Sequence, residues 1–440
     1  MIMKTYLTFH ELAERVLDDL AQGLCVAITG LSNSGKSDLM RGLARSEVQS
    51  EYAERLGRPV ALIYVDCNRA VAITAQAFYE VVLRSILEWL DRVESTDLAA
   101  TLRGRYQSIT EAENAFTASL SFNLALSELC EGMDTIAVLF FDEFDEVYEA
   151  LDERALLNLR ALHDRFTERL RYVTATVRRL REIRGGVVVG EFAELFTHST
   201  YPMPLLTDDE AGHLLETMHL TPKSQRLQQA CVQLGGGHPG MLVAVAQTFA
   251  SLEAGWKGDP LLIASQRPQV SAECLKIWGQ LTSEEQAGLV SLVVEEEAGL
   301  PQPLMRHLEG LGLLREAKPF SPLFAQFVGR RGRGKEIEAE GVHMDTDAGD
   351  VWVDGIRIPV LTDLEYRLLE LLYERRDKLT DKYRIVTAVW GEEYLGDVDD
   401  ARVEKLVSRL RSKIEVDPSQ PRYLITQRGR GYKLLARPGA

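Results

Sequence analysis

The sequence predicts an α/β protein in three parts: a parallel sheet covered by helices, a helical region, and a smaller α+β domain at the C-terminal end. Short apolar runs alternate with helical patterns over residues 1–206, as is typical of parallel sheets. Residues 207–328 show mainly helical patterns. Short strands, three helices and a hairpin then follow one another within residues 342–440.

Four apolar runs are expected as strands, because parallel strands that are covered on both faces read as continuous apolar segments. Helical patterns separate these runs. We expect strands at Leu24–Thr29, Val60–Val65, Ile136–Phe141 and Tyr172–Val177, and helices at 8–21, 36–47, 75–93 and 152–169.

The composition is that of an ordinary globular protein, with 45% hydrophobic and 26% charged residues. No apolar run reaches the roughly 18 residues that a membrane span needs, so we expect no membrane partner. Glu11 and Glu14 interrupt the N-terminal segment, which argues against a secretion signal. The five cysteines are scattered and form no C-x-x-C pair, which favours a reducing cytoplasm without a disulfide frame or a zinc site.

The formal charge of −16 is unevenly distributed, and the distribution bears on nucleic-acid binding. Residues 341–440 hold 17 basic and 18 acidic side chains, so almost all of the excess negative charge lies before them. Within residues 402–433, 9 basic side chains outnumber 3 acidic ones. One basic segment in an acidic protein indicates a localised surface for phosphates.

A phosphate-binding loop is predicted at residues 30–37, where GLSNSGKS fits G-x-x-x-x-G-K-[ST] between an expected strand and an expected helix. The two glycines permit backbone conformations that side chains would block. Loop N–H groups and the helix N-terminus then surround the phosphates, Lys36 reaches the β- and γ-phosphates, and the Ser37 hydroxyl binds Mg²⁺. The plainer alternative is a Gly/Ser turn that happens to contain a lysine. The expected nucleotide-binding residues of the loop are Gly30, Ser32, Asn33, Ser34, Gly35, Lys36, Ser37 and Asp38.

Two carboxylates, Asp142 and Glu143, follow the third apolar run. In phosphate-loop proteins an Asp at a strand end holds Mg²⁺, and the next Glu can act as a general base toward water. More acidic residues follow before residue 150, so a solvated acidic loop is the alternative. Together with the phosphate loop, the pair predicts an ATPase with Asp142 as a metal ligand and with Glu143 and Lys36 as catalytic residues.

Two further segments are candidates for sensing the nucleotide. The fourth apolar run leads to Arg178, which would report the γ-phosphate, although an arginine on a surface turn is equally ordinary. At Gly235–Pro239 the sequence GGGHP lies between helical patterns. This segment would bring backbone and the Pro239 ring against the adenine, or place a proline in the first turn of a helix, and both can hold together.

Residues 1–330 resemble the STAND branch of the AAA+-like P-loop ATPases. The resemblance rests on the phosphate loop, the Asp142–Glu143 pair, the strand that ends near Arg178, and GGHP at Gly236–Pro239, which is similar to the family's G-x-P lid motif. Many relatives carry a repeat array as a sensor, and no repeat is visible in this sequence, so the sensed signal stays open. The resemblance implies a nucleotide-controlled switch with a P-loop ATPase core at 1–206, a helical lid at 207–270 and a winged-helix-like unit at 271–328.

The C-terminal region carries clear helix-start and turn signals. The expected strands Val351–Val353 and Ile356–Ile358 flank an Asp-Gly pair, which is typical of a hairpin turn. Thr362 is the expected N-cap of a helix at Asp363–Glu374, and a glutamate three residues later completes a capping box. A shorter helix is expected at Lys382–Val389.

The third expected helix of this region, at 401–415, has two distinct faces. Its apolar residues form one stripe, and Arg, Lys and Ser side chains lie on the opposite side. Such a helix suits the major groove, where arginines reach guanine edges and phosphates, and a basic face in water is the alternative. A hairpin with a basic, Gly-rich tip follows within residues 423–433. The expected DNA-binding residues are Arg402, Lys405, Ser408, Arg409, Arg411, Thr426, Arg428 and Arg430.

Residues 342–435 closely resemble the OmpR/PhoB-type winged-helix effector domain. The resemblance implies that the 401–415 helix enters the major groove of double-stranded DNA and that the following hairpin reaches the adjacent minor groove. Relatives usually have VDVH where this chain has VEKL at 403–406, so the base preference is not inherited. The matching stretches, in family order, are LTDLEY at 361–366, VWG at 389–391, SRLRSK at 408–413 and TQRGRGY at 426–432.

The sequence therefore predicts an ATP-controlled transcriptional regulator in the cytoplasm, with ATP and Mg²⁺ as cofactors. A linker at 329–341 would join the ATPase to the DNA-binding domain at 342–440. One alternative is an AAA+ initiator-like or DNA-remodelling ATPase that assembles on DNA. Another is a nucleotide-independent DNA-binding protein, against which the intact phosphate-loop and acidic residues argue. Homo-oligomerisation, the operator, and the choice between ATP binding and hydrolysis as the switch stay open.

Overall fold

The structure of the chain is a computed structural model, which describes residues 9–253, 255–294, 300–332, 341–346, 349–353, 356–358, 361–391, 400–415, 418, 420–427 and 429–435. The chain forms two compact units. The first unit comprises residues 1–261 and 300–322, and the second comprises residues 262–299 and 323–440. Over the residues described, no helix is both long and apolar enough to cross a membrane.

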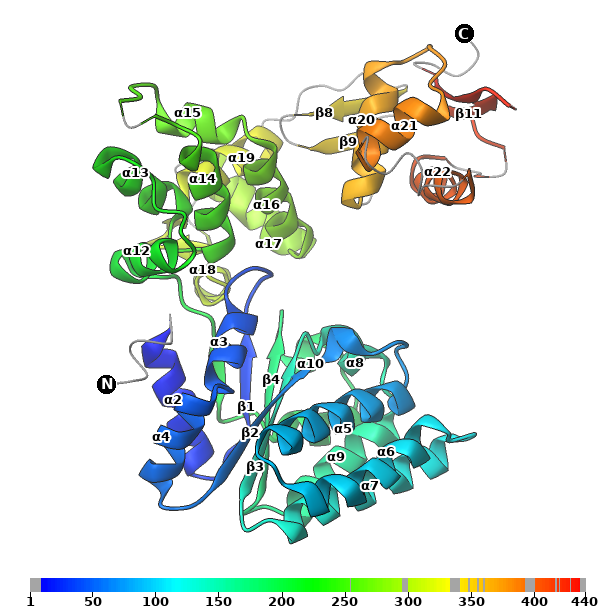
Figure 1. The fold of residues 1–440 in the computed structure, drawn as a ribbon. Helices are drawn as coiled ribbons and strands as arrows, with labels where there is room; N and C mark the ends of the chain where they lie inside the picture. Colours follow the sequence, from blue (N-terminus) through cyan, green and yellow to red (C-terminus); the bar gives the residue numbers. More distant parts are fainter. Residues whose placement is uncertain are drawn as a thin grey trace. The chain divides into compact units, whose positions relative to one another are not determined.

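A five-stranded parallel sheet lies at the centre of the first unit (Figure 1). Its strand order is β2-β3-β4-β1-β5, and helices connect successive strands, so the predicted α/β class with a parallel sheet is confirmed. The fifth strand was not predicted, because three residues without an apolar run give no strand pattern. The strands are β1 Val26–Thr29, β2 Val60–Asp66, β3 Ile136–Asp142, β4 Leu170–Thr176 and β5 Thr200–Pro202.

Helices cover both faces of the sheet, since β1, β3 and β4 are buried along their whole length (Figure 1). Two predicted helices are too long: the one at 36–47 ends at Leu43, and the one at 152–169 ends at Arg165. Helices α6 and α7, between β2 and β3, were not predicted. The helices of this region are α2 His10–Ala21, α3 Lys36–Leu43, α4 Ser46–Leu56, α5 Ala75–Arg92, α6 Thr96–Thr110, α7 Ala115–Gly132, α8 Asp145–Ala150, α9 Glu153–Arg165, α10 Leu180–Ile183 and α11 Val187–Glu194.

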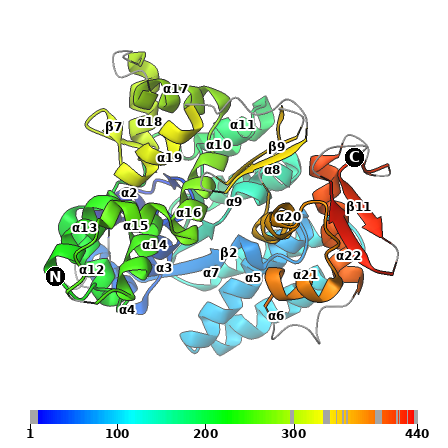
Figure 2. The same cartoon turned by 90° about the horizontal axis from the view of Figure 1, so that it is seen from above.

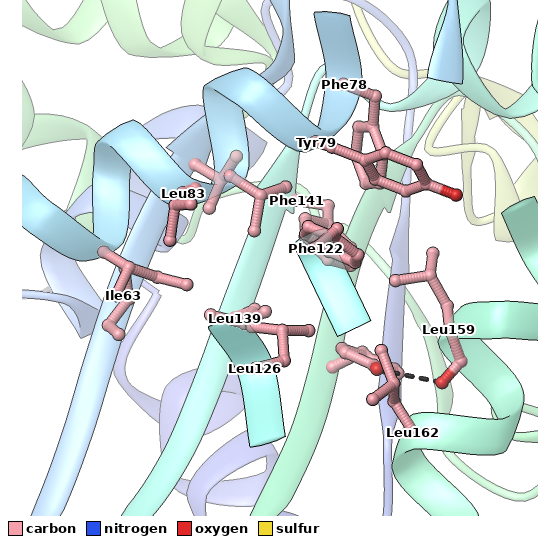
Figure 3. Packing of buried hydrophobic residues seen from close by; sticks show 14 of the residues in the cluster. Ile63, Phe78, Tyr79, Leu83, Phe122, Leu126, Leu139, Phe141, Leu159 and Leu162 are labelled. Atoms are coloured by element: carbon pink, nitrogen blue, oxygen red, sulfur yellow. Dashed lines mark hydrogen bonds between the residues drawn. The ribbon is translucent and has the colours of Figure 1, made fainter. Parts of the chain in front are cut away.

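A hydrophobic core lies between the sheet and helices α5, α6, α7 and α9 (Figure 3). Ile63, Leu139 and Phe141 point toward this face, because alternate residues of a strand share a face. Tyr79 of α5 stacks on Phe122 of α7, with ring centroids 4.2 Å apart. This packing holds the carboxyl end of β3, where the acidic pair follows.

The remainder of the first unit is helical, apart from one short hairpin. Thr207 begins α12 with a capping box, in which its backbone N–H donates to Glu210 at 2.9 Å. After α18, β6 and β7 pair antiparallel. The elements are α12 Asp208–Thr217, α13 Gln225–Gly235, α14 Pro239–Ala250, α15 Pro260–Ser265, which continues into the second unit, α18 Gln302–Gly310, β6 Leu314–Arg315 and β7 Lys318–Pro319.

The second unit begins with helices α16 Pro268–Gly279 and α17 Ser283–Val294, and α19 Pro322–Gly332 joins it from the first unit. Helix α19 corrects the start of the predicted linker at 329–341, because its helical residues continue through Gly332. The buried Phe327 and Val328 sustain the apolar side of this helix into its last turns. Residues 333–340 of the predicted linker lie outside the described residues.

The C-terminal domain of the second unit is an α+β domain with the predicted winged-helix order of elements. Its three helices lie together beside β11 (Figure 2) and enclose one core with β8, β9 and the final hairpin. The helices predicted at Asp363–Glu374 and Lys382–Val389 are confirmed to the residue, and Thr362 forms the predicted capping box. The predicted Asp-Gly turn lies outside the described residues, although β9 and β10 on either side of it pair antiparallel. The elements are β8 Val342–Asp345, β9 Asp350–Val353, β10 Ile356–Arg357, α20 Asp363–Glu374, α21 Lys382–Val389, α22 Asp400–Ile414, β11 Leu424–Gln427 and β12 Gly431–Leu434.

Candidate functional site

The predicted phosphate loop connects β1 to α3 at the carboxyl edge of the parallel sheet. Two of its residues have a left-handed backbone, Asn33 with φ 59° and Gly35 with φ 97°. A Cβ on Gly35 would lie 2.5 Å from the Phe9 ring, and a Cβ on Gly30 would lie 2.8 Å from Ser34 Oγ. Both positions therefore need glycine, and the loop brings successive N–H groups to a helix N-terminus, an arrangement that binds phosphates.

The Lys36 side chain folds back over this loop, and the residue is only 5% exposed. Its Nζ donates to the carbonyl oxygens of Gly30 at 2.6 Å and Leu31 at 3.1 Å. Ser34 Oγ is buried and has no hydrogen-bond partner within the described part of the chain. A buried ammonium group and a buried hydroxyl inside a loop of N–H donors fit an anionic ligand such as a phosphate chain.

The other predicted loop residues have less enclosed surroundings. Ser32 and Ser37 are half-buried, and Ser37 occupies the first turn of α3 directly after the buried lysine. Asp38 is exposed and forms an ion pair with Arg41 at 2.8 Å. The Asp38 carboxylate is thus engaged by its own helix, and its predicted contact with nucleotide stays a prediction.

The predicted acidic pair lies at the same edge of the sheet, where β3 ends. Asp142 is 1% exposed, its Oδ2 accepts a hydrogen bond from the Tyr64 hydroxyl at 2.6 Å, and its Oδ1 has no partner among the residues that the structure describes. Burial and the bond to Asp142 raise the pKa of Tyr64, which keeps its hydroxyl a donor. Glu143 is exposed and has φ 52°, so the two neighbouring carboxylates have different surroundings.

This burial argues against a simple solvated acidic loop. Asp145 Oδ1 accepts the Val177 N–H at 2.8 Å, which ties the start of α8 to the end of β4, and burial raises the pKa of the Asp145 carboxyl. Asp145 is therefore a structural acceptor.

Arg178 follows β4, the strand between β3 and β1. Gly30 N–H donates to Thr176 O at 3.0 Å, so the first residue of the phosphate loop is bonded to the end of β4. The Thr176 hydroxyl donates to Arg178 O at 2.7 Å, which shapes the turn. The structure thus brings the half-buried Arg178 to the edge that carries the loop and the acidic pair, and its role as a γ-phosphate sensor stays a prediction.

The GGHP segment joins α13 to α14 and lies against the phosphate loop. Pro239 is the first residue of α14, and His238 caps the helix by accepting the Met241 N–H on Nδ1 at 3.3 Å, so the expected helix start is confirmed. Gly240 N–H donates to Asn33 O at 3.1 Å. The first turn of α14 therefore contacts the phosphate loop, while the adenine contact of Pro239 stays a prediction.

The other side of the GGHP segment packs on the chain that follows β7. A Cβ on Gly236 would lie 1.9 Å from Phe320 O, and the His238 and Phe320 rings are 5.4 Å apart. The Ser321 hydroxyl donates to Leu234 O at 2.6 Å. This contact was not predicted, because its two sides are far apart in the chain and neither carries a recognisable pattern beyond the glycines.

In the C-terminal domain, α22 has the two faces that its sequence predicts. Arg402, Lys405, Ser408 and Arg409 are exposed. The opposite stripe is buried in the core of the domain and consists of Val403, Leu406, Val407, Leu410 and Ile414.

Arg411 differs from its neighbours on α22, because its guanidinium bonds to the hairpin. Its Nε and Nη2 donate to Leu424 O at 2.9 and 2.6 Å, and Nη2 also donates to Thr426 Oγ1 at 2.7 Å. Arg411 thus attaches β11 to α22, and Thr426 and Arg430 are exposed on the hairpin. Arg428 lies outside the described residues, and a DNA contact by any of these side chains stays a prediction.

With this geometry established, residues 359–434 match the family model described as transcriptional regulatory protein, C terminal. These residues therefore form a C-terminal domain of that transcriptional-regulator family. The sensory transduction protein RegX3 of Mycobacterium tuberculosis is 41% identical over 98 residues, which are 22% of this chain and 42% of that protein. The transcriptional regulatory protein YrkP of Bacillus subtilis is 38% identical over 95 residues, or 22% of this chain and 40% of that protein. The chain thus spans about two fifths of the length of these relatives.

Three solved structures are similar to parts of the chain. A Walker-type ATPase of Pyrococcus abyssi is 14% identical with a TM-score of 0.46, covering 72% of this chain and 94% of that one. The Aeropyrum pernix ORC2 protein in its ADP form is 16% identical with a TM-score of 0.42, covering 73% and 83%. The Klebsiella pneumoniae RstA DNA-binding domain in complex with the RstA box is 23% identical with a TM-score of 0.21, covering 24% and 100%. Because these TM-scores are below 0.5, the nucleotide site rests on the residues described above.

Proposed function

We propose that the protein is a transcriptional regulator whose binding to double-stranded DNA is controlled by ATP in its N-terminal unit. Phosphates of ATP would be held by the 30–37 loop and Lys36, and Mg²⁺ by Ser37 and Asp142. Ser34 Oγ and Asp142 Oδ1 support this fit, because both are buried polar atoms without a partner in the described chain. The left-handed backbone of Gly35, with φ 97°, is consistent with a phosphate-binding loop.

ATP hydrolysis is part of the proposal. Bound Mg²⁺ would neutralise charge on the phosphates. Glu143 is exposed beside the buried Asp142, so its carboxylate is free to accept a proton from an attacking water. Arg178 follows β4 at the same edge of the sheet, and its side chain would sense the γ-phosphate.

The DNA-binding surface is proposed to be the exposed face of α22 together with the β11–β12 hairpin. Arg402, Lys405 and Arg409 supply positive charge on one side of a helix whose other side is anchored in the core. Relatives of this C-terminal region are named as regulators of transcription and sensory transduction, and the proposal extends that role to this chain.

The observation that supports control by ATP is a series of contacts from the phosphate loop to the start of α19. Gly240 N–H bonds to Asn33 O, so a shift of the phosphate loop would act on the first turn of α14, directly after the GGHP segment. That segment packs on Phe320, and Ser321 bonds to α13. Helix α19 begins at the next residue, Pro322. A nucleotide-dependent shift of the lid would therefore move the first turn of α19 with it.

The last turn of α19 is anchored to the C-terminal domain. Arg331 forms an ion pair with Asp350 of β9 at 2.5 Å, and their side chains are 3% and 5% exposed. The Arg331 guanidinium also lies over the rings of Phe327 and Trp278, with 4.5 and 5.1 Å to the centroids. Burial and the nearby Asp345 raise the pKa of Asp350, whereas the paired Arg331 guanidinium favours its charged form. The domain is thus held by a buried contact and is not merely tethered.

Mapping of bound DNA across the genome tests this function. A regulator controlled by ATP should occupy a few sharp sites near promoters, and Lys36→Ala should change that occupancy. Broad occupancy, or occupancy centred on replication origins, would instead favour an initiator-like or remodelling machine. Identical occupancy of the genome by the wild type and by Lys36→Ala would contradict control by ATP.

A further inference from the structure

Asp142 is held by a tyrosine from the neighbouring strand. β2 and β3 are parallel and in register, with Asp66 opposite Asp142. Tyr64 lies two residues before Asp66, so it shares the same face of the sheet. Its hydroxyl donates to Asp142 Oδ2 at 2.6 Å. Of the two Asp142 carboxylate oxygens, Oδ1 is the one left without a partner in the described part of the chain, and the residue is 1% exposed.

A second residue connects Tyr64 to the helix of the phosphate loop. Arg41 of α3 approaches the Tyr64 hydroxyl with Nη1 at 3.5 Å, and its guanidinium lies 6.0 Å from the centroid of the Tyr64 ring. Arg41 is half-exposed and also pairs with Asp38, so this connection is weak beside the short bond from Tyr64 to Asp142.

We propose that Tyr64 is a positioning residue that orients the Asp142 carboxylate for Mg²⁺. The terminal torsion of an aspartate has broad, roughly two-fold preferences, so a bond to one oxygen selects one orientation. With Oδ2 engaged, Oδ1 is the oxygen presented to the cation. Partners that orient a metal ligand typically change metal affinity by about 10- to 100-fold when removed. This inference rests on the proposed Mg²⁺–nucleotide site.

The test uses the full-length chain and measures ADP affinity by calorimetry over a Mg²⁺ titration, with a series in EDTA. We expect Tyr64→Phe to leave the ADP affinity in EDTA unchanged. The Mg²⁺ concentration at which ADP binding reaches half of its Mg²⁺-dependent increase in affinity should rise by about 10-fold or more. Binding of Mn²⁺ in the presence of ADP, followed by electron paramagnetic resonance, should weaken by a similar factor. Arg41→Ala should have a smaller effect.

Tyr52→Phe is the matched control, because Tyr52 is a buried tyrosine whose hydroxyl likewise donates to an oxygen within the chain, Leu17 O at 2.8 Å. This variant should keep the wild-type dependence on Mg²⁺. Placing Tyr64→Phe in an Asp142→Asn background should bring no further loss, since Tyr64 acts through Asp142. An additive loss in that background overturns the assignment even if Tyr64→Phe lowers the stability of the fold.

Two failures can be told apart. If the wild-type chain shows no binding of nucleotide that depends on Mg²⁺, the proposed function fails together with this inference. The other failure is that the wild-type chain binds nucleotide in a Mg²⁺-dependent way, but Tyr64→Phe shows the same Mg²⁺ dependence as the wild type and Tyr52→Phe. In that case the nucleotide site stands and the role of Tyr64 is overturned.

Discussion

The two proposed binding regions are built in opposite ways. At the carboxyl edge of the sheet, Lys36 and Asp142 are buried, and Asp142 retains an oxygen without a partner in the described chain. On α22, Arg402, Lys405 and Arg409 are exposed to solvent. A buried polar atom without a partner lowers stability, whereas an exposed cation loses little hydration. The first region therefore has a buried acceptor that a bound cation would satisfy, and the second is identified by its pattern of exposed charge.

The largest expected effect concerns the buried region. Lys36→Ala should abolish measurable ATP binding, because the motif places Lys36 at the β- and γ-phosphates and the loop has no comparable cation. Isothermal calorimetry measures this directly. Lys223→Ala, which removes an exposed lysine between α12 and α13, is the control and should bind as the wild type does. Unchanged ATP affinity in Lys36→Ala would show that the 30–37 loop is not the nucleotide site.

A second buried charge lies in the second unit, where Arg331 pairs with Asp350. Arg331→Ala should lower the free energy of unfolding by roughly 3–5 kcal/mol, because it leaves the Asp350 carboxylate buried without its cation. Denaturant unfolding followed by tryptophan fluorescence measures the change. Arg330→Ala removes the neighbouring exposed arginine and should change stability by no more than about 0.5 kcal/mol. Equal effects of the two substitutions would mean that the ion pair does not anchor the domain.

The exposed member of the acidic pair should affect chemistry and leave binding intact. Glu143→Gln should slow ATP hydrolysis by about 10²-fold or more while keeping the affinity for ATP. A phosphate-release assay together with calorimetry separates the two quantities. Glu146→Gln, an exposed carboxylate in the first turn of α8, is the matched control. A normal rate of hydrolysis in Glu143→Gln would assign the general base to another group.

The smallest single effects are expected on the exposed basic face. Arg409→Ala should weaken binding to a specific duplex by about 1–3 kcal/mol if it contacts a base edge, and binding to random duplexes by less. Arg430→Ala should weaken both by similar factors, because a hairpin tip that meets backbone reads little sequence. Fluorescence anisotropy on both duplexes checks the difference. Equal losses on both duplexes for Arg409→Ala would make it a phosphate contact.

The sequence predicted best what depends on neighbouring residues. The helices α20 and α21, the Thr362 capping box and the phosphate loop have their signals within a few residues, and each lies where it was predicted. It predicted least what depends on tertiary contacts. Helix α7 is largely apolar and shows no clear amphipathic stripe. β5 is only three residues long, and pairing with β1 places it in the sheet.

The residues of the candidate site also fall into those that local motifs predict and those that only tertiary contacts identify. Sequence motifs located Lys36, Asp142 and the GGHP segment. Tyr64 had no local signal, because it lies inside an apolar strand and its partner is 78 residues further along the chain. The Arg331–Asp350 pair was missed for a related reason: a Gly- and Arg-rich stretch reads as a solvated linker until the burial of its side chain is known.

In the proposed function, nucleotide in the buried region at 30–37 and Asp142 controls DNA binding by the exposed face of α22. The most direct test is the affinity for a duplex from a strongly occupied genomic site, measured without nucleotide, with ADP and with a slowly hydrolysed ATP analogue. Salt and protein concentration must be fixed, because both change apparent affinity. We predict a difference of about 5- to 150-fold between nucleotide states. The difference should disappear in Lys36→Ala and shrink when Arg331 and Asp350 are both replaced by leucine. Three equal affinities with an unchanged oligomeric state would contradict the account.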